Sequence, residues 1–213
     1  MVKITYYLDV VSSWCYYFEP VWESLAETFG DKLEREWEIT LIPEEGLPES
    51  AEEEDSYYRR SGIITRQQQM LNSSWVDPSL KEYLAPNLVS LACRALGVTG
   101  DTVRLEIARG AMVDGLKVGD WEVSAEIAAK ASGLTSEMIL KKARSPEIER
   151  IARSSTARFN AFGVNQRPAF FLESEIEDRA IFSGLIQAEP LVATINAMIS
   201  DAEAYRSWSA HQS

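Results

Sequence analysis

The chain has 213 residues, 46% of them hydrophobic, and this length is compatible with one domain or with one domain that carries an insertion. Its formal net charge is −12, and no stripe of lysine and arginine offsets it, so we expect binding neither to nucleic acid nor to anionic membranes. Two cysteines do not make a disulfide scaffold, and the single histidine, His211 in a polar tail, argues against a metal site and against a Ser-His-Asp triad.

The first 20 residues predict a strand, a turn and the start of a helix. Residues 4–7 are aromatic or β-branched, which is typical of a half-buried strand. Ser12 or Ser13 is then a suitable helix N-cap, because a serine hydroxyl can accept a hydrogen bond from a backbone N–H of the first turn. A side chain at this position meets backbone donors and the positive end of the helix dipole, which favour an anion such as a thiolate.

The next segments continue the pattern. Apolar residues at helical spacing predict a helix over 13–29, which Gly30 ends. Alternating apolar residues predict a second strand over 36–42, which Pro43 stops. The start of the chain is therefore expected to be β-α-β.

The middle of the chain is predicted to be helical. The acidic run 49–55 is expected to be a solvated loop and helix start, which is the usual place of a charge run. Asp120, and Thr135 or Ser136, are suitable N-caps within 56–144. The helices expected there are 56–71, 78–96, 101–115, 121–132 and 135–144.

The end of the chain returns to mixed structure. The expected elements are a helix over 145–162, strands over 169–172 and 179–183, and a helix over 189–205. The order β-α-β, helices, α-β-β-α predicts an α/β thioredoxin fold with an inserted all-helical domain. We assign residues 1–50 and 145–213 to the thioredoxin-fold domain and 51–144 to the helical insertion.

The N-terminus favours a cytoplasmic location. It enters a strand at once, without a basic stretch followed by an apolar one, so no signal peptide is visible. No apolar run approaches the roughly 20 residues that a membrane span needs. We therefore expect a soluble cytoplasmic protein.

The line Asp9-Val-Val-Ser-Ser-Trp-Cys-Tyr16 resembles the redox turn of the DsbA-like branch of thioredoxin-fold proteins, whose pattern is Asp-x-x-Cys-Pro-x-Cys-Tyr. Cys15 matches the second cysteine, and Ser12 replaces the first. Dithiol–disulfide exchange needs an attacking thiolate and a resolving thiol, so this motif cannot perform the two-cysteine cycle. Cys93 lies in an apolar helix and is expected to be a buried structural thiol.

Later segments extend the resemblance over nearly the whole chain. Residues 118–123, Val-Gly-Asp-Trp-Glu-Val, resemble the Ile-Gly-Asp-x-Glu-Val segment of the family's insertion. Residues 162–171 resemble its Gly-Val-x-Gly-Thr-Pro-Thr-Phe signature, in which Pro168 would be the cis proline that faces the redox turn. Residues 184–189 are similar to the ending of dithiol–disulfide isomerases of polyketide biosynthesis.

Kappa-class glutathione transferases and 2-hydroxychromene-2-carboxylate isomerases share this fold and carry serine where this chain has Ser12. The resemblance implies a thiol-dependent transferase or isomerase, in which Ser12 stabilises the thiolate of bound glutathione or another small-molecule thiol. It also implies a homodimer, because related transferases and isomerases pair. The residues it implies for substrate binding are Ser13, Trp14, Arg167 and Pro168.

Two features depart from these families. They have Ser-Pro-Tyr at the turn, and their acidic residue that grips the glutathione amine is not found at Leu185 or Ile186. Arg167 is unusual beside the proline. It could attract a carboxylate ligand, or it could be a surface arginine paired with an acid.

Other interpretations stay open for the same residues. Cys15 is either a low-pKa thiol that forms mixed disulfides singly, as a catalytic residue beside Ser12, or a packed cysteine that faces the core. Ser12 and Ser13 could be N-caps alone. The alternative functions are a monothiol disulfide oxidoreductase that uses Cys15 and a non-catalytic binding module that has lost the dithiol. An aromatic cleft between the two lobes, or ordinary packing, accounts for Trp14, Tyr16, Tyr17 and Trp75.

Overall fold

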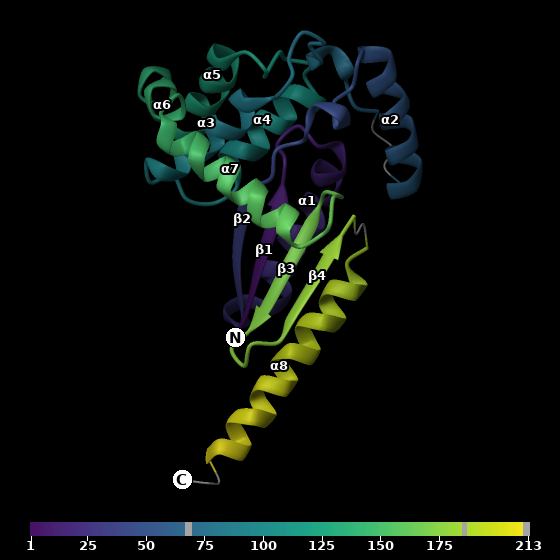
Figure 1. Cartoon of the computed structure of the whole chain (residues 1–213), viewed down its shortest axis with the longest axis vertical. Coiled ribbons are helices and arrows are strands. Elements are labelled where there is room, and N and C mark those ends of the chain that lie inside the picture. The colour runs from purple at the N-terminus through teal and green to yellow at the C-terminus, as the bar shows by residue number, and fades with distance from the viewer. Residues whose placement is uncertain (67–69, 185–186, 211–213) are drawn as a thin grey trace. The chain divides into compact units, whose positions relative to one another are not determined.

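The computed structural model describes residues 1–66, 70–184 and 187–210 (Figure 1). The expectations for His211, Leu185 and Ile186 concern positions outside these residues. Within them the predicted α/β class is confirmed, because a four-stranded sheet is combined with helices that mostly follow one another between its second and third strands. No helix in the described part of the chain is long and apolar enough to cross a membrane.

The sheet brings together segments from the two ends of the chain. Its strands are β1 Val2–Leu8, β2 Leu33–Ile39, β3 Ala169–Ser174 and β4 Arg179–Ser183, in the order β2-β1-β3-β4. β1 and β3 are antiparallel, with Val2 opposite Ser174 and Tyr7 opposite Ala169. β4 pairs antiparallel with the other edge of β3. Aromatic and β-branched residues dominate β1, which explains why this segment extends and pairs.

The helices mostly begin at or near the predicted residues. They are α1 Ser13–Phe29, α2 Ala51–Thr65, α3 Leu84–Ala95, α4 Thr102–Met112, α5 Trp121–Ser132, α6 Ser136–Ala143, α7 Pro146–Ala161 and α8 Glu189–Ala210. Two predicted N-caps are confirmed: Asp120 accepts hydrogen bonds from two backbone N–H groups of α5, and Thr135 accepts one from the N–H of Met138. The bounds of α1, α5 and β4 are those that the sequence predicts.

The second strand was predicted too late in the chain. Its alternation of buried residues is correct, but β2 ends at Ile39 rather than at residue 42. The next backbone N–H groups donate to side chains instead of to a strand. The N–H of Leu41 donates to Thr156 Oγ1 at 3.0 Å, and the N–H of Ile42 donates to Asp9 Oδ2 at 3.0 Å. The chain therefore leaves the sheet while Leu41 stays buried and Ile42 is half-buried.

α2 was also misplaced, because the helix expected at 56–71 is Ala51–Thr65. Ser50 is its N-cap and accepts a hydrogen bond from the N–H of Glu53 at 3.1 Å. Arg66, with φ of 56°, adopts the left-handed conformation that ends many helices. The acidic run therefore forms the first turn of a helix, where carboxylates are favoured by the dipole.

The chain divides into two compact units. The first comprises Met1–Leu8, Phe18–Glu38 and Val164–Ser213, and the second comprises Asp9–Tyr17 and Ile39–Gly163. α1 therefore begins in the second unit and ends in the first. The predicted domains follow the order of elements along the chain, whereas these units follow compactness, so the division at residues 51 and 144 stays a prediction.

The core of the first unit is aromatic. The ring of Phe170 stacks on Tyr6 with 4.9 Å between centroids and lies 4.7 Å from the ring of Phe18. Trp22 packs against Tyr6 at 5.1 Å. α8 packs against β3 and β1 and buries Leu191, Ile195 and Met198. These rings and aliphatic side chains hold the sheet and its helices together by hydrophobic burial.

The second unit is organised around α3, which contacts α4, α5, α6 and α7. Every residue of α3 from Ala85 to Cys93 is buried. The helix predicted over 78–96 begins only at Leu84, because the preceding residues form turns. In these turns the N–H of Asp77 donates to the hydroxyl of Tyr83 at 2.7 Å.

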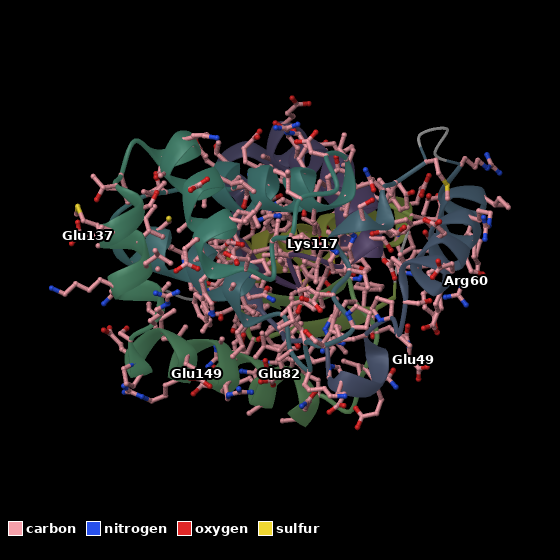
Figure 2. The ribbon with its side chains drawn as sticks, turned by 90° about the horizontal axis from the view of Figure 1, so that it is seen from above. Glu49, Arg60, Glu82, Lys117, Glu137 and Glu149 are labelled. Atoms are coloured by element: carbon pink, nitrogen blue, oxygen red, sulfur yellow. The ribbon has the colours of Figure 1, made fainter. Side chains whose placement is uncertain are left out.

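Charged side chains cover the outside of the second unit, and Figure 2 labels several of them. Arg153 on α7 donates to both carboxylate oxygens of Glu82 at 2.8 Å and to Glu149 at 2.9 Å. This network joins the turn before α3 to α7. Because all three groups are exposed, we expect each pair to contribute little to stability.

Candidate functional site

The segment that precedes α1 is held by buried polar side chains. The carboxylate of Asp9 accepts a hydrogen bond from the N–H of Val11 at 3.0 Å and one from the N–H of Ile42 at 3.0 Å. The side-chain oxygen of Asn87 on α3 accepts one from the N–H of Val10 at 3.1 Å. Buried backbone groups need such partners, and here the partners also fix the path of the loop that leads to α1.

Ser12 occupies the N-cap position of α1. Its Oγ accepts a hydrogen bond from the N–H of Cys15 at 3.4 Å, and the residue is only 8% exposed. A serine hydroxyl has one proton to donate in addition to its two lone pairs. The cap uses a lone pair, so the proton is available to a ligand at the start of the helix.

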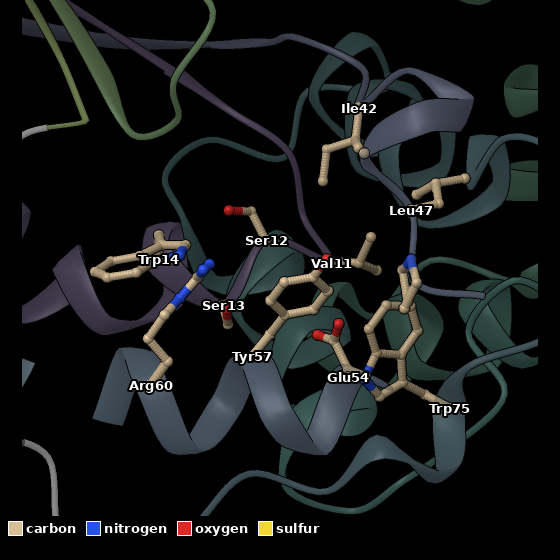
Figure 3. A pocket seen from close by; sticks show the side chains of 12 residues that line it. Val11, Ser12, Ser13, Trp14, Ile42, Leu47, Glu54, Tyr57, Arg60 and Trp75 are labelled. Atoms are coloured by element: carbon tan, nitrogen blue, oxygen red, sulfur yellow. The ribbon is translucent and has the colours of Figure 1, made fainter. Parts of the chain in front are cut away.

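A pocket of about 240 Å³ opens beside this N-cap, and all of its lining residues belong to the second unit. Figure 3 shows side chains from α2 facing the segment that carries Ser12. Three of the predicted site residues, Ser12, Ser13 and Trp14, contribute to its wall. The remaining lining residues are Val11, Ile42, Gly46, Leu47, Pro48, Glu54, Tyr57, Arg60 and Trp75.

Glu54 is a residue of the pocket that the sequence reasoning missed. The acidic run was expected to be solvated, yet Glu54 is 6% exposed. Tyr58 donates a hydrogen bond to its carboxylate, and the indole N–H of Trp75 donates to the hydroxyl of Tyr58 at 2.6 Å. Burial raises the pKa of Glu54 to about 7. The hydrogen bond from Tyr58 lowers this pKa, but by less than burial raises it. The expectation for this residue was therefore wrong.

The burial of Glu54 follows from its place on α2. Glu54, Tyr58 and Ser61 are the buried residues of this helix, and they are spaced by four and three positions. This spacing places all three on one helical face. The sequence carries the signal, because only one acid of the run shares a face with that tyrosine and serine. This spacing can be recognised only once the helix is known to begin at Ala51.

Arg60 supplies a cation at the same pocket. Its guanidinium lies 5.1 Å from the centre of the Tyr57 ring, and Figure 3 shows it extending from α2 toward Trp14. Arginine over an aromatic ring is held in place while its remaining N–H groups stay available to an anion. The pocket therefore combines a cation, a serine hydroxyl and a buried carboxyl.

A family model described as a DSBA-like thioredoxin domain matches residues 3–196. The chain belongs to the DSBA-like thioredoxin family. Family membership confirms the predicted thioredoxin fold with a helical insertion and assigns the chain to a family of thiol–disulfide oxidoreductases and isomerases. No curated protein matches the chain.

Solved structures share the fold at low sequence identity. The chain is similar to the cytosolic disulfide reductase DsbM from Pseudomonas aeruginosa, with 19% identity, a TM-score of 0.75, and 93% of this chain and 98% of that chain covered. The structure of DsbM with GSH is 18% identical with a TM-score of 0.71, and the match covers 93% of this chain and 99% of that chain. Pseudomonas aeruginosa DsbA is 13% identical with a TM-score of 0.58, and the match covers 96% of this chain and 86% of that chain. At these identities the likeness shows the fold alone.

Two predicted site residues of this DSBA-like chain lie in the first unit. The peptide bond between Arg167 and Pro168 is cis, and the carbonyl of Pro168 accepts a hydrogen bond from the N–H of Gly184 at 2.9 Å. The guanidinium of Arg167 donates to the carbonyl of Asn165 at 3.4 Å. Ser12 belongs to the second unit, so the approach of Pro168 to Ser12 stays a prediction.

The two cysteines are both buried, and they do not form a disulfide with each other. Cys15 is 2% exposed, at the first turn of α1. Burial raises the pKa of the Cys93 thiol to about 11, which leaves it protonated at neutral pH and confirms the expectation of a buried thiol. Among the described residues, no three His, Cys, Asp or Glu side chains are grouped so that they could hold a metal ion.

The aromatic residues that the sequence singled out divide into two sets. Trp14 and Trp75 line the pocket. Tyr16 and Tyr17 are not part of its described lining, and burial is the main cause that raises the pKa of each phenol. The tryptophans therefore give the pocket apolar surface beside its charged groups.

Proposed function

We propose that this DSBA-like protein is a thiol-dependent transferase or isomerase, in which Ser12 stabilises the thiolate of a bound small-molecule thiol such as glutathione. The observation that carries the proposal is the N-cap geometry of Ser12 in the pocket wall. Its oxygen accepts from the N–H of Cys15, which directs the hydroxyl proton away from the helix. A hydroxyl donor and the positive end of a helix dipole both favour a thiolate over a thiol.

The charges of the pocket support a thiol that carries carboxylates. Arg60 offers N–H groups that match a carboxylate in geometry and charge. Trp14 and Tyr57 offer apolar surface for the carbon chain of such a ligand. Glutathione has one thiol and two carboxylates, so it is the first ligand to test. The neighbouring structure of DsbM with GSH gives a second reason to begin with glutathione.

The monothiol alternative requires Cys15 to meet a disulfide. A thiol that is 2% exposed reacts with a bulky disulfide only after the helix start has moved. Ser12 lines the pocket without such a movement, which is why we prefer the serine-assisted chemistry.

Calorimetric titration with glutathione tests the proposal. We expect the wild-type protein to bind glutathione and to bind S-methyl glutathione more weakly, because the thioether cannot form a thiolate. Ser12→Ala should lower the affinity for glutathione by about tenfold or more, since it removes a hydrogen bond to a charged group. Thr135→Ala is the matched control, because Thr135 is also an N-cap of the second unit but lies outside the described pocket lining.

Other outcomes would select the alternatives. Equal affinity of wild type and Ser12→Ala would refute the role of Ser12. Reaction with a disulfide probe that disappears in Cys15→Ser would favour the monothiol oxidoreductase. Glutathione binding without turnover of any activated electrophile would favour a binding module.

A further inference from the structure

We propose that Glu54 accepts the proton of the thiol that binds beside Ser12 and later returns it to the product. This inference rests on the proposed function, because it concerns the same pocket and the same ligand. Both residues line the pocket, Ser12 from the start of α1 and Glu54 from the first turns of α2. Figure 3 shows the carboxyl group of Glu54 directed from α2 toward the segment that carries Ser12.

The carboxyl group of Glu54 is held in place by a series of contacts that extends from α2 to two other segments of the chain. Tyr58, one helical turn later, donates to the carboxylate, and Trp75 donates to the tyrosine oxygen at 2.6 Å. The ring of Trp75 is in turn packed edge-on against Tyr83 of the adjoining segment, with 5.0 Å between centroids. Tyr58 and Trp75 are each about 1% exposed. A carboxyl held by such a relay has a fixed orientation, which proton transfer requires.

The acidity of the group is suited to this task. Burial is the main cause that raises the pKa of Glu54 to about 7, and the charges of Glu53 and Asp55 raise it further. The hydrogen bond from Tyr58 lowers it, and burial also raises the pKa of Tyr58, which keeps that phenol a donor at neutral pH. A general base is most effective when its pKa lies near the working pH.

Other titratable and charged groups face the same region. Glu53, Asp55, Tyr57 and Arg60 come from α2, and Tyr83 comes from the segment before α3 and interacts with the charge of Glu54. Arg60 is a cation of the pocket lining, and it favours an anionic ligand. None of the tyrosines is ionised at neutral pH, because the pKa of each is raised.

The proton transfer balances without an oxidant or a metal. The S–H bond of the thiol breaks, its electron pair stays on sulfur, and the proton passes to the carboxylate of Glu54. The thiolate, held by the hydroxyl of Ser12, then forms a carbon–sulfur bond with an activated double bond, such as that of an unsaturated ketone. The π electrons move to the neighbouring carbon and oxygen, and the carboxyl of Glu54 returns its proton there.

Counting protons during binding provides a test that does not depend on turnover. Glutathione is titrated by calorimetry in buffers of different ionisation enthalpy at about pH 8, where Glu54 is ionised and the free thiol is mostly protonated. In the wild-type protein the thiol proton moves to Glu54, and the negative charge of the bound thiolate raises the pKa of this carboxyl above the pH of the titration, so we expect almost no proton to be released to the buffer. In Glu54→Gln the thiol should release about one proton to the buffer as it binds in the thiolate form. Glu52→Gln, an exposed acid of the same helix, should behave as the wild type.

Kinetics with an unsaturated ketone and glutathione complete the test. We expect Glu54→Gln to lower kcat/KM by about 100-fold while the affinity for S-methyl glutathione stays unchanged. If Glu54→Gln does not fold, Tyr58→Phe provides a second test of the role of Glu54. It removes a hydrogen bond that favours the ionised carboxyl, so the rise of kcat/KM with pH should move to higher pH.

The outcomes separate the two proposals. If the wild type binds no thiol, the proposed function fails and this inference fails with it. If the wild type binds glutathione but releases the same proton as Glu54→Gln, with an unshifted pH profile in Tyr58→Phe, only the role of Glu54 is overturned.

Discussion

The two units differ in what they bury. The first unit buries rings, with Phe170 packed against Tyr6 and Phe18 at its centre. The second unit buries polar groups: apart from Thr5 and Ser174, the buried polar side chains of the described residues all belong to it. Apolar burial stabilises a fold without further conditions, whereas a buried polar group costs free energy unless it is hydrogen-bonded. The free-energy cost of burying polar groups therefore falls mainly on the second unit.

These costs concentrate around the pocket. Asp9 and Asn87 position the loop before α1, Ser12 caps the helix, and Glu54 is held by Tyr58. Each group is satisfied by a partner that also fixes a wall of the pocket. We infer that the first unit supplies stability and that the second carries the specific geometry that thiol chemistry needs. The following experiments test this difference.

The largest effect is expected from Phe170→Ala in the first unit. Phe170 is fully buried and touches several rings, so its loss removes a large apolar area and leaves a cavity. We expect the free energy of unfolding to fall by about 3–5 kcal/mol. Urea denaturation followed by tryptophan fluorescence measures this change. Phe170→Leu is the control and should cost much less, because leucine keeps most of the apolar volume; an equal loss in both variants would show that the ring contacts, and not the buried apolar volume, are what stabilise this core.

The next effect concerns the pH dependence that Glu54 brings to the second unit. Its pKa in the folded protein, about 7, lies above the ordinary value of 4.5, so the fold holds this proton more tightly than the unfolded chain does. Its contribution to stability is therefore fully present below pH 4.5, declines as the pH rises to about 7 and is constant above that. The shift corresponds to about 3 kcal/mol.

Urea denaturation at a series of pH values between these limits checks the prediction. Glu54→Gln retains an acceptor for Tyr58 but cannot ionise, so it should lack this decline and become more stable than the wild type at pH above 7. Glu52→Gln, which removes an exposed charge from the same helix, should keep the wild-type decline. Parallel curves for wild type and Glu54→Gln would contradict a raised pKa.

Glu54 also shows which part of the site the sequence could predict. Ser12, Ser13 and Trp14 were predicted from a local pattern, a strand followed by a helix with a capping serine, and such a pattern depends on neighbours in the sequence. The burial of Glu54 depends on Tyr58 and on Trp75, which belongs to another segment. A charge run is usually solvated, so a rule based on composition assigns all of its acids to the surface.

The fold shows the same division between local and tertiary information. α1 and α5 have the predicted bounds, because their apolar periodicity and their caps are local. β2 ends early because Asp9 and Thr156, both distant in sequence, accept the hydrogen bonds that would have continued the strand. Tertiary partners of this kind leave no trace in the local pattern. The sequence therefore predicted the elements and their order better than it predicted where they end.

A smaller effect is expected from Asn87→Ala in the second unit. The substitution leaves the N–H of Val10 without its acceptor and the carbonyl of Tyr83 without a donor, and both groups are buried. We expect a loss of about 2 kcal/mol in the free energy of unfolding and weaker binding of the pocket ligand, because the loop before α1 loses its anchor. Asn160→Ala, on the exposed face of α7, should change stability by less than about 0.5 kcal/mol.

The smallest effect separates stability from function at the helix caps. Ser12→Ala and Thr135→Ala each remove one N-cap hydrogen bond in the second unit, so both should lower the free energy of unfolding by about 1 kcal/mol. Urea denaturation should therefore not distinguish them, whereas glutathione titration should, because only Ser12 lines the pocket. If the two variants lost stability equally and bound glutathione equally, Ser12 would be a cap alone. The buried polar groups of the second unit would then serve its fold, as the rings serve the first.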